Sequence, residues 1–401
     1  MKMRVALVLP GLGRVQRGAE TAFVELARGL AARPDTEVEL FGTGRQGLDG
    51  LAAHVLPCVP RERFEGWPRL PGFRGETWYE EFTFATALAL RRAYRPKRFD
   101  ITLSCTFPHV HGHVRRAGRG LRDCRRPLNV YVTQNGDWPC RRTNAEFRAF
   151  HCDGLVCTNP EYFDRHRDAY PSALIPNGVD PDVYRPGKRL AGPNGDAACD
   201  LLPREQTAGR RVVLMVSALI PSKRVDDGIR ALARVPDAYL LLAGDGPCRQ
   251  EIQALAARLL PGRHRLLGNL PHERMPGLYH RADALLHASQ EEPFGIVYLE
   301  GAASGLPVVA HDWAVTRWIL GDTALYADTG DAEALAGAIG QALRPEVARD
   351  LGARARARVL DGWTWRHQAD RYRDFFARLL HSRREQSSAR VKALAGVALS
   401  R

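Results

Sequence analysis

A pair of glutamates frames a turn and a predicted helix in the last third of the chain. Glu292 is followed by Pro293 and Gly295, which mark a loop, and the apolar run behind them carries Glu300. A helix that starts in this way presents backbone N–H groups and the positive end of its dipole, which both favour a diphosphate. The spacing therefore predicts an anion site near Gly295 and Ile296. The simpler interpretation, a helix-terminal acid and a surface acid, stays open.

Lysine is scarce in this basic chain, which gives each lysine weight as a candidate ligand for phosphate. Only five of the 58 Lys and Arg residues are lysines, and the formal net charge is +13. A basic balance can indicate binding to nucleic acid or to an anionic membrane. Here arginine is dispersed over nearly the whole length and no nucleic-acid module is recognisable, so we expect no nucleic-acid partner. Lys223, in a loop after a predicted strand, is the candidate cation.

The sequence carries no signal for a metal site, a disulfide framework or a membrane-spanning helix. Its eight cysteines are scattered, without a C-x-x-C pair or zinc-ligand spacing. No run of about 18 apolar residues occurs, and the first apolar run is too short for a signal peptide. We therefore expect a cytoplasmic protein without a metal or another cofactor. Peripheral contact with the inner face of an anionic membrane stays open, through the Arg-rich stretch 115–126 or the aromatic segment 61–98.

The elements that must position these residues follow an α/β pattern. Near-continuous apolar runs indicate strands buried on both faces of a parallel sheet, and runs with helical spacing alternate with them. We interpret the aromatic-rich segment 61–100 as an insertion or a variable substrate-side segment. The expected strands are 4–9, 37–41, 101–105, 129–133, 154–158, 173–176, 212–216, 239–243, 265–267, 284–287, 307–310 and 324–326. The expected helices are 19–32, 225–234, 251–260, 273–280, 298–304, 332–343 and 364–380.

This α/β rhythm breaks once, in a segment rich in Pro, Gly, Asn and charged residues. We therefore expect an N-terminal Rossmann-like domain at 1–185, a linker at 186–207 and a second Rossmann-like domain at 208–362. An amphipathic helix is expected within 363–401, packing back on the first domain, with a frayed tail beyond Ser382. Ligands of such sheets bind at the carboxyl ends of the strands.

The segment from Glu292 to Glu300 resembles the E-x7-E motif of the retaining family 4 glycosyltransferases of GT-B fold. Further motifs of that family follow in matching order over nearly the whole chain, and the likeness is weakest in 45–100 and 185–210. They are Arg17-Gly18-Ala19-Glu20 in the first loop, Asn177-Gly178-Val179-Asp180, the segment 217–223 that ends in Lys223, Gly244-Asp245-Gly246-Pro247, and the base-recognition strand that ends at Leu270. The resemblance implies two Rossmann-like domains that face each other across a cleft, with the C-terminal helix crossing back to the first.

The resemblance also implies roles for residues around a nucleotide-sugar donor. Lys223 would donate to the leaving diphosphate, and Glu300 would accept hydrogen bonds from the ribose. Glu292 would hold the hydroxyls of the transferred sugar, because the family is usually assigned a front-face mechanism rather than a carboxylate nucleophile. Family members usually need no metal. Further contacts with the donor would come from Gly18, Arg224, Gly244, Leu270, Phe294, Gly295 and Ile296.

Two positions depart from the family pattern. Ala218 stands where a second cation, an arginine, is expected, and Arg224, or Arg17 across the cleft, would have to replace it. Asn135 stands where many members carry a histidine near the donor sugar, and an amide can hydrogen-bond but cannot titrate. We count Asn135 with Glu292 and Lys223 as the catalytic candidates. Acceptor-side candidates on a loop after Phe107-Pro108 are His109, His111 and His113.

We therefore expect a retaining, metal-independent glycosyltransferase that moves a hexosyl group from a nucleotide-diphosphate sugar to a hydroxyl. UDP is slightly favoured over GDP as the nucleotide. The acceptor is a glycan, a lipid-linked glycan or a small natural product. Three alternatives stay open: a sugar-nucleotide epimerase of similar fold, a catalytically degenerate protein that only binds sugar nucleotides, and a basic protein that binds anionic surfaces.

Overall fold

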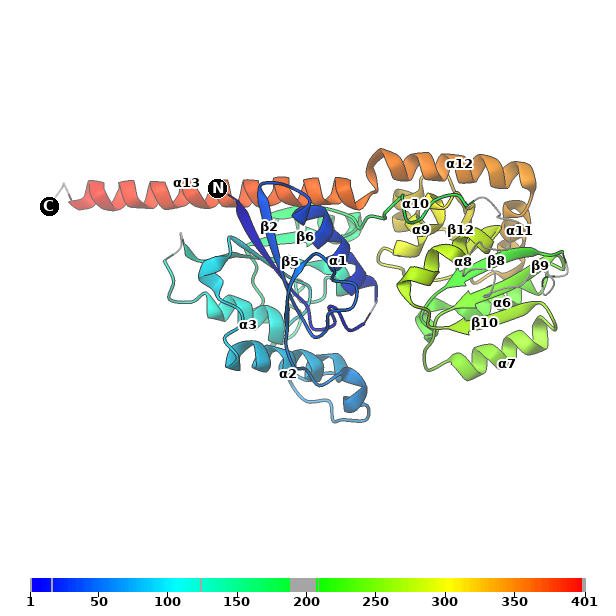
Figure 1. The fold of residues 1–401 in the computed structure, drawn as a ribbon, viewed down its shortest axis with the longest axis horizontal. Helices are drawn as coiled ribbons and strands as arrows, with labels where there is room; N and C mark the ends of the chain where they lie inside the picture. The colour runs from blue at the N-terminus through cyan, green and yellow to red at the C-terminus, as the bar shows by residue number, and fades with distance from the viewer. Residues whose placement is uncertain (1, 16, 123–124, 188–206, 208, 399–401) are drawn as a thin grey trace. The chain divides into compact units, whose positions relative to one another are not determined.

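The chain folds into two units, each built around one parallel sheet. The computed structural model describes residues 2–15, 17–122, 125–187, 207 and 209–398, with side chains up to residue 389. Unit 1 comprises Met1–Pro176 and Trp365–Arg401, and unit 2 comprises Asn177–Thr364. Within each unit, helices flank the strands, which confirms the α/β class that the apolar runs predict (Figure 1).

Unit 1 contains a seven-stranded sheet in the order β3-β2-β1-β4-β5-β6-β7, with all pairs parallel. The order reverses between β1 and β4, as in doubly wound folds. The strands are β1 (Met3–Val8), β2 (Thr36–Gly42), β3 (Ala52–Val55), β4 (Ile101–Ser104), β5 (Leu128–Val132), β6 (Gly154–Cys157) and β7 (Ser172–Leu174). The helices are α1 (Gly18–Ala31), η1 (Arg61–Phe64), α2 (Glu76–Leu90), η2 (Pro96–Arg98), α3 (His109–Ala117), η4 (Thr133–Asn135), η5 (Phe147–Ala149), α4 (Pro160–His166) and α13 (Trp365–Ala398).

The long C-terminal helix α13 is part of unit 1. It lies against α1, where a Cβ on Gly29 would fall 2.8 Å from the Cβ of Ala369, so the two helices approach closely. Tyr372 and Phe376 of α13 are buried, and Arg33 donates to Asp370 at 2.6 Å. The helix continues to Ala398, beyond the expected end of the amphipathic helix at residue 380. Its last turns lack proline and are rich in Arg and Ala, which favour a helix.

The two units divide at Pro176–Asn177, earlier than the boundary expected after residue 185. The N–H of Val179 donates to the carbonyl of Trp363 at 3.0 Å, and the ring of Tyr184 packs edge-on against Tyr279. These contacts hold the segment after Asn177 on unit 2. Most of the expected linker at 186–207 lies outside the described residues.

The segment 61–100, expected to be variable, contains the 15-residue helix α2. Two glutamates in its middle, Glu80 and Glu81, are buried together with the preceding Trp78 and Tyr79. Because consecutive residues are buried, the helix shows no simple apolar stripe, and the helical period is hidden in the sequence. On its other turns, Phe84 and Leu88 pack into the core of unit 1.

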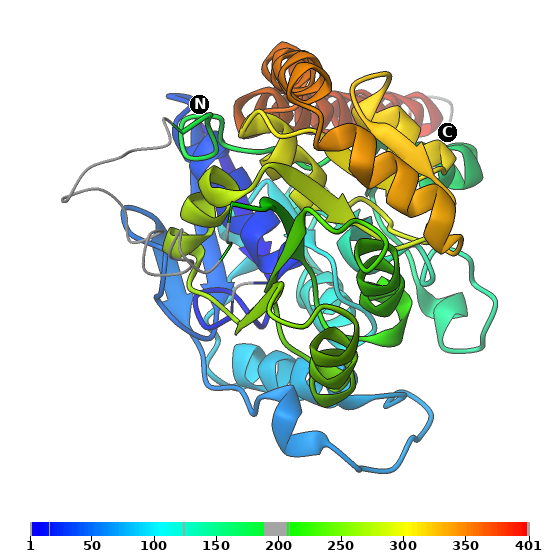
Figure 2. The ribbon, with the colours of Figure 1, turned by 90° about the vertical axis from the view of Figure 1, so that its right-hand side faces the viewer.

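Unit 2 contains a six-stranded parallel sheet in the order β10-β9-β8-β11-β12-β13. One core cluster takes side chains from α8, α9, α10 and α12, the other from α6, α7 and α11, so helices cover both faces (Figure 2). The strands are β8 (Arg211–Val216), β9 (Ala238–Ala243), β10 (His264–Gly268), β11 (Ala284–His287), β12 (Val308–His311) and β13 (Leu325–Ala327). The helices are η6 (Pro221–Lys223), α6 (Val225–Leu232), α7 (Arg249–Leu259), η7 (His272–Arg274), α8 (Met275–Arg281), α9 (Ile296–Ala303), α10 (Ala314–Leu320), α11 (Ala332–Ala342) and α12 (Pro345–Gly362).

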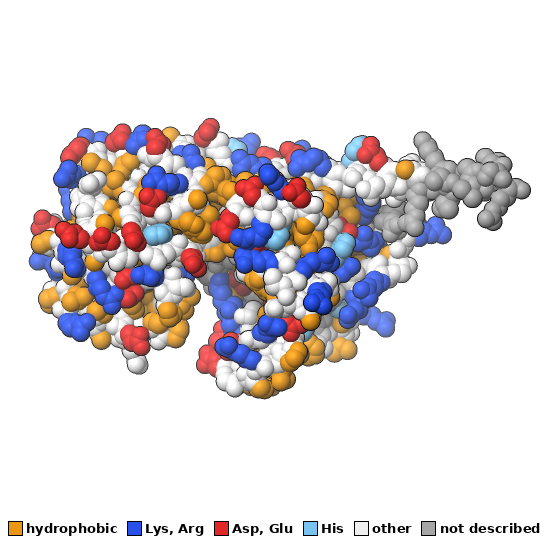
Figure 3. Space-filling model, turned by 180° about the vertical axis from the view of Figure 1, so that it is seen from behind, with side chains coloured by type: hydrophobic (Ala, Val, Ile, Leu, Met, Phe, Trp, Pro, Cys, Tyr) orange, Lys and Arg blue, Asp and Glu red, His pale blue; other side chains and the backbone are white. Residues whose placement is uncertain are grey.

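Basic side chains are dispersed on one face of the protein. On the face drawn in Figure 3, Lys and Arg side chains are interspersed with acidic and apolar ones. No helix in the described part of the chain is both long and apolar enough to span a membrane.

Candidate active site

The predicted donor-binding residues of unit 2 follow four neighbouring strands. Lys223 comes after β8, Gly244 after β9, Leu270 after β10 and Glu292 after β11. Because all strands of this sheet run parallel, their carboxyl ends meet at one edge. The strand order reverses between β8 and β11, and open α/β sheets bind their ligands at such a switch point. The fold therefore gathers these residues where a ligand is expected.

Glu292 is the centre of a buried charged cluster. It is 8% exposed, and its Oε2 accepts hydrogen bonds from Lys223 Nζ at 2.5 Å and from His287 Nε2 at 2.9 Å. The side chain of Lys223 remains partly exposed, so it can contact both the carboxylate and a ligand. The cluster thus joins the loops after β8 and β11 and places one cation at the sheet edge.

His287 is a member of this cluster that the sequence did not single out. It is the last residue of β11, it is 4% exposed, and its ring packs edge-on against Tyr298. A histidine that ends a predicted buried strand, five residues before a motif glutamate, is the signal that could have found it. Its Nε2 fixes the orientation of the Glu292 carboxylate.

The surroundings of Glu292 keep it ionised. Burial raises its pKa, but the hydrogen bond and charge of His287 and the charge of Lys223 outweigh burial and lower the pKa to about 2. A carboxylate of such low basicity is a poor general base and a weak nucleophile at neutral pH. Its chemistry is to accept hydrogen bonds and to hold Lys223 in place.

Replacing Glu292 with glutamine is expected to flatten the dependence of stability on pH below pH 4.5. The pKa of this carboxyl is lower in the folded chain than its ordinary value of 4.5, so its stabilisation is complete above pH 4.5 and is lost as the pH falls through about 2. Urea unfolding from pH 7 to pH 2 should show the wild-type free energy falling more steeply than that of Glu292→Gln, by up to about 1.4 kcal/mol per pH unit. Parallel curves would contradict the ion cluster.

The start of α9 has the geometry that the glycine in its loop predicts. Gly295 adopts a φ of 73°, and a Cβ there would fall 2.7 Å from the ring of Tyr298 and 2.9 Å from Cγ of Glu292. Ile296 is the first residue of α9, two residues before the expected start of this helix. The first N–H groups of an α-helix have no acceptor within the helix, so this loop offers donors beside Glu292.

Phe294 can contribute only through its backbone. Its side chain is 4% exposed and contacts Trp318 and Trp363 in the core. Leu270 likewise packs partly on that core. Both residues therefore hold their loops at the sheet edge.

Glu300 is buried in α9, 7% exposed, and bound to side chains of its own unit. Tyr279 of α8 donates to its Oε2 at 2.5 Å. Burial raises the pKa of Glu300, while hydrogen bonding and the charge of His272 oppose the rise. Tyr279 was not predicted, because it comes from a segment with no motif and meets Glu300 only through packing.

Gly244 and Arg224 hold the loops around Lys223 in unusual backbone conformations. Gly244 has a φ of 134°, and a Cβ there would fall 1.8 Å from the carbonyl oxygen of Ser217, so only glycine fits. Arg224 has a φ of 51° and donates from Nε to Asp227 at 2.6 Å. Its guanidinium, expected to replace the cation missing at Ala218, is thus neutralised by an acid of α6.

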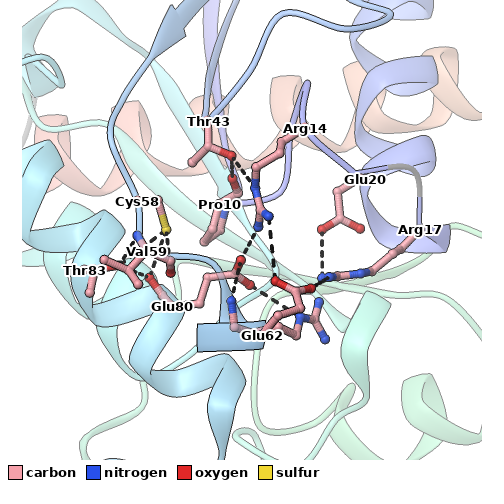
Figure 4. A network of polar contacts seen from close by, with 11 residues as sticks. Pro10, Arg14, Arg17, Glu20, Thr43, Cys58, Val59, Glu62, Glu80 and Thr83 are labelled. Atoms are coloured by element: carbon pink, nitrogen blue, oxygen red, sulfur yellow. Dashed lines mark hydrogen bonds and ion pairs between the residues drawn. The ribbon is translucent and has the colours of Figure 1, made fainter. Parts of the chain in front are cut away.

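In unit 1, the loop before α1 enters a network of ion pairs (Figure 4). Arg17 contacts Glu62 at 3.2 Å and Glu20 at 4.0 Å, and Arg14 contacts the buried Glu80. Gly18 is exposed at the first position of α1, and a Cβ there would meet nothing. The positive charge of Arg17 is therefore already balanced within unit 1.

Asn135 ends η4, directly after β5, at the carboxyl edge of the unit 1 sheet. Its Nδ2 lies 3.4 Å from the carbonyl oxygen of Cys105, and its own carbonyl accepts a hydrogen bond from Trp138 Nε1 at 3.2 Å. Asn135 belongs to unit 1 and the Glu292 cluster to unit 2.

The histidines after Phe107-Pro108 lie on the helix α3, so their expected placement on a loop was wrong. His111 is 1% exposed, hydrogen-bonded to Ser104 and to the carbonyl of His151, and burial lowers its pKa to about 4. His109 donates to the carbonyl of Gly72 at 2.8 Å. These contacts give both rings structural roles. Among the described residues, no group of three or more His, Cys, Asp or Glu side chains is placed to hold a metal ion.

Two protein-family models match most of the chain between them. The model for "Glycosyl transferases group 1" matches residues 203–358, which include the loops around Lys223 and Glu292. The model for "Glycosyltransferase Family 4" matches residues 16–183, which include Gly18 and Asn135.

Curated relatives match parts of the chain. The GDP-mannose-dependent alpha-(1-6)-phosphatidylinositol monomannoside mannosyltransferase of Mycolicibacterium smegmatis is 34% identical over 258 residues, 59% of this chain and 65% of that protein. The lipopolysaccharide core biosynthesis glycosyltransferase LpsE of Rhizobium meliloti is 32% identical over 213 residues, 52% of this chain and 58% of the relative. The chain thus matches less than two thirds of the length of these relatives.

Solved structures resemble the chain over almost its whole length. Sucrose-phosphate synthase from Thermosynechococcus elongatus has a TM-score of 0.73 at 20% identity and covers 95% of this chain, with 100% of that chain covered. Anabaena Alr3699/HepE in complex with UDP-glucose has a TM-score of 0.69 at 17% identity, with 95% and 100% covered. At these identities the likeness shows the fold. With the two family models it leads to one conclusion: the chain belongs to the family 4 glycosyltransferases, and its two Rossmann-like units have the GT-B fold.

Proposed function

We propose that this protein transfers a hexosyl group from a nucleotide-diphosphate sugar to a hydroxyl of an acceptor, with retention of configuration and without a metal ion. The observation that carries the proposal is the Lys223–Glu292–His287 cluster at the switch point of unit 2, next to the glycine turn that starts α9. A cation and helix N–H groups beside each other suit a leaving diphosphate.

In the proposed reaction, the bond between the anomeric carbon and the diphosphate oxygen breaks, and a bond to the acceptor oxygen forms on the same face. A departing phosphate oxygen takes the acceptor proton. Lys223 and the N–H groups at Gly295 and Ile296 stabilise the charge that develops on the diphosphate. Glu292, with its pKa of about 2, orients sugar hydroxyls instead of attacking carbon.

Glu300 holds the ribose in this proposal. Tyr279 binds Oε2 of this side chain, and the carboxyl group has further acceptor sites for ribose hydroxyls. The loops at Gly244, Leu270 and Phe294 shape the nucleotide site through their backbone. Arg224, Gly18 and Asn135 remain proposed contacts with the donor, and unit 1 is the proposed site of the acceptor.

We propose GDP-mannose as the donor, rather than the UDP-hexose that the sequence slightly favours. Two relatives support this choice: the M. smegmatis protein at 34% identity and a dimannoside mannosyltransferase of Mycobacterium tuberculosis at 32% are both named GDP-mannose-dependent. The acceptor is a hydroxyl of a glycan or of a lipid-linked glycan, the kinds of molecule that the names of the relatives contain.

Thermal unfolding with a panel of nucleotides is expected to show stabilisation by GDP and GDP-mannose, with a smaller effect of UDP and UDP-glucose. At a ligand concentration of 100 times Kd, native-state binding contributes about 2.7 kcal/mol, or roughly 5–10 °C for a domain of this size. EDTA should leave the shift unchanged. A panel without any shift would contradict the proposed function, and a shift that needs a divalent metal would contradict metal independence.

A further inference from the structure

A cavity of about 380 Å³ lies in unit 1 beside Asn135, at the carboxyl edge of the sheet where η4 follows β5. This is at the small end of the range of ligand pockets, roughly 300–1,000 Å³, and fits a single ring rather than a nucleotide. We call it the ring pocket. The described residues that line it are Thr77, Trp78, Glu81, Asn135, Trp138 and Phe147.

Aromatic side chains make most of the wall of the ring pocket. The rings of Trp78 and Trp138 lie 5.8 Å apart at an angle of 21°, and Phe147 lies 4.9 Å from Trp138. Trp78 and Phe147 are buried, whereas Trp138 is half-buried, with its indole held by the hydrogen bond to the Asn135 carbonyl. These rings are therefore fixed before a ligand arrives, which lowers the entropy cost of binding.

Glu81 contributes one carboxyl oxygen that has no hydrogen-bond partner among the described residues. This oxygen is Oε2, and the side chain is buried, 3% exposed. Burial and the nearby charge of Glu80 raise the pKa of Glu81 well above its ordinary range, against one hydrogen bond from the His109 backbone. The raised pKa favours the protonated form of the carboxyl group, which can both donate and accept a hydrogen bond. A hydroxyl of a ligand would supply the hydrogen bond that this oxygen lacks.

The lining of the ring pocket also disfavours an anionic ligand. Among the described residues that line it, Glu81 is the only ionisable one. A phosphate would find no cation there, and an uncharged group with hydroxyls meets the polar atoms of both Glu81 and Asn135. The C–H face of a pyranose or cyclitol ring is apolar and flat, which matches an indole wall.

We propose that the ring pocket binds an uncharged, polyhydroxylated ring of the acceptor, a pyranose or a cyclitol. The ring places its C–H face on Trp138, and its hydroxyls bond to Glu81 and to the Asn135 amide. This inference rests on the proposed transferase function, because it assigns the ring to the acceptor.

The test is saturation-transfer NMR on the full-length protein, with methyl α-D-mannopyranoside and myo-inositol as probes and no nucleotide present. Transfer from the protein to the ring C–H protons of at least one probe is expected. Trp138→Ala and Glu81→Leu should each weaken binding about tenfold, the equivalent of one lost contact of about 1.4 kcal/mol. Glu81→Gln, which keeps a donor and an acceptor without charge, should bind within about threefold of wild type. Glu65→Gln alters an exposed acid and serves as the control.

Three results would overturn the inference: no transfer to either probe, equal binding by wild type, Trp138→Ala and Glu81→Leu, or transfer to the mannose ring of GDP-mannose that depends on Trp138. The third result would assign the pocket to the donor.

Thermal shifts with GDP, measured on the same samples, test the proposed function separately. If the probes bind but GDP causes no thermal shift, the transferase proposal is wrong and the ring pocket stands as a binding site. If GDP causes a thermal shift but the probes do not bind, only this inference is wrong.

Discussion

Replacing Lys223 with alanine is expected to lower the turnover of GDP-mannose by about 100- to 1,000-fold, the usual effect of removing one preorganised donor from a developing anion. Lys223 brings the positive charge of the Glu292 cluster to the carboxyl edge of unit 2. Its neighbour Arg224 is bound to Asp227, and alanine stands at position 218 where the family carries a cation. Neutralisation of the negative charge on the leaving diphosphate therefore depends heavily on Lys223.

The measurement is the initial rate of GDP release, with circular dichroism to confirm that the variant is folded. Lys97→Ala removes an exposed lysine of unit 1 and should leave the rate unchanged. Lys223→Arg keeps the charge in a different geometry and should recover part of the loss. Wild-type turnover in Lys223→Ala would show that the diphosphate is neutralised elsewhere.

Replacing Glu292 with glutamine is expected to lower turnover by at least about 10- to 100-fold. This decrease corresponds to the loss of one hydrogen bond to a charged group. Glutamine keeps the size of the side chain, but it removes the charge that holds Lys223 at 2.5 Å and His287 at 2.9 Å. The loss should appear mainly in kcat, because Glu292 holds the part of the donor that changes in the transition state.

The adjacent Glu291 provides a matched control, since it is exposed and one residue away. Glu291→Gln should keep wild-type rates. Mass spectrometry of the wild-type protein with donor alone should show no hexosyl group on Glu292, because a carboxylate with a pKa of about 2 is a weak nucleophile. A trapped adduct on Glu292 would replace the front-face mechanism with a double displacement.

The parallel sheets could be predicted because their strands are buried on both faces and read as apolar runs. β1 and β9, with the runs Val5–Val8 and Tyr239–Ala243 in their cores, show this clearly. Elements that bury polar side chains escaped prediction. The helix α2 encloses Glu80 and Glu81, and the short edge strand β3 is only partly buried, so neither has a clean period.

In the candidate site, the sequence placed Lys223, Gly244 and Glu292 at the ends of strands, and the parallel topology brings these strand ends to one edge. It could not supply the partners that packing selects. Tyr279 reaches Glu300 only because α8 lies in the same core as α9, and His287 reaches Glu292 across the turn between them. Contacts of this kind depend on the angles between elements, which no local pattern encodes.

The central claim is that the carboxyl edge of unit 2 binds the diphosphate of a sugar nucleotide through Lys223. Titration calorimetry with GDP on the wild-type protein, Lys223→Ala and Lys97→Ala tests it most directly. The account predicts that GDP binds the wild type and Lys97→Ala equally, and that Lys223→Ala binds it at least about tenfold more weakly, a loss of about 1.4 kcal/mol. Equal affinity of all three proteins for GDP would contradict the account.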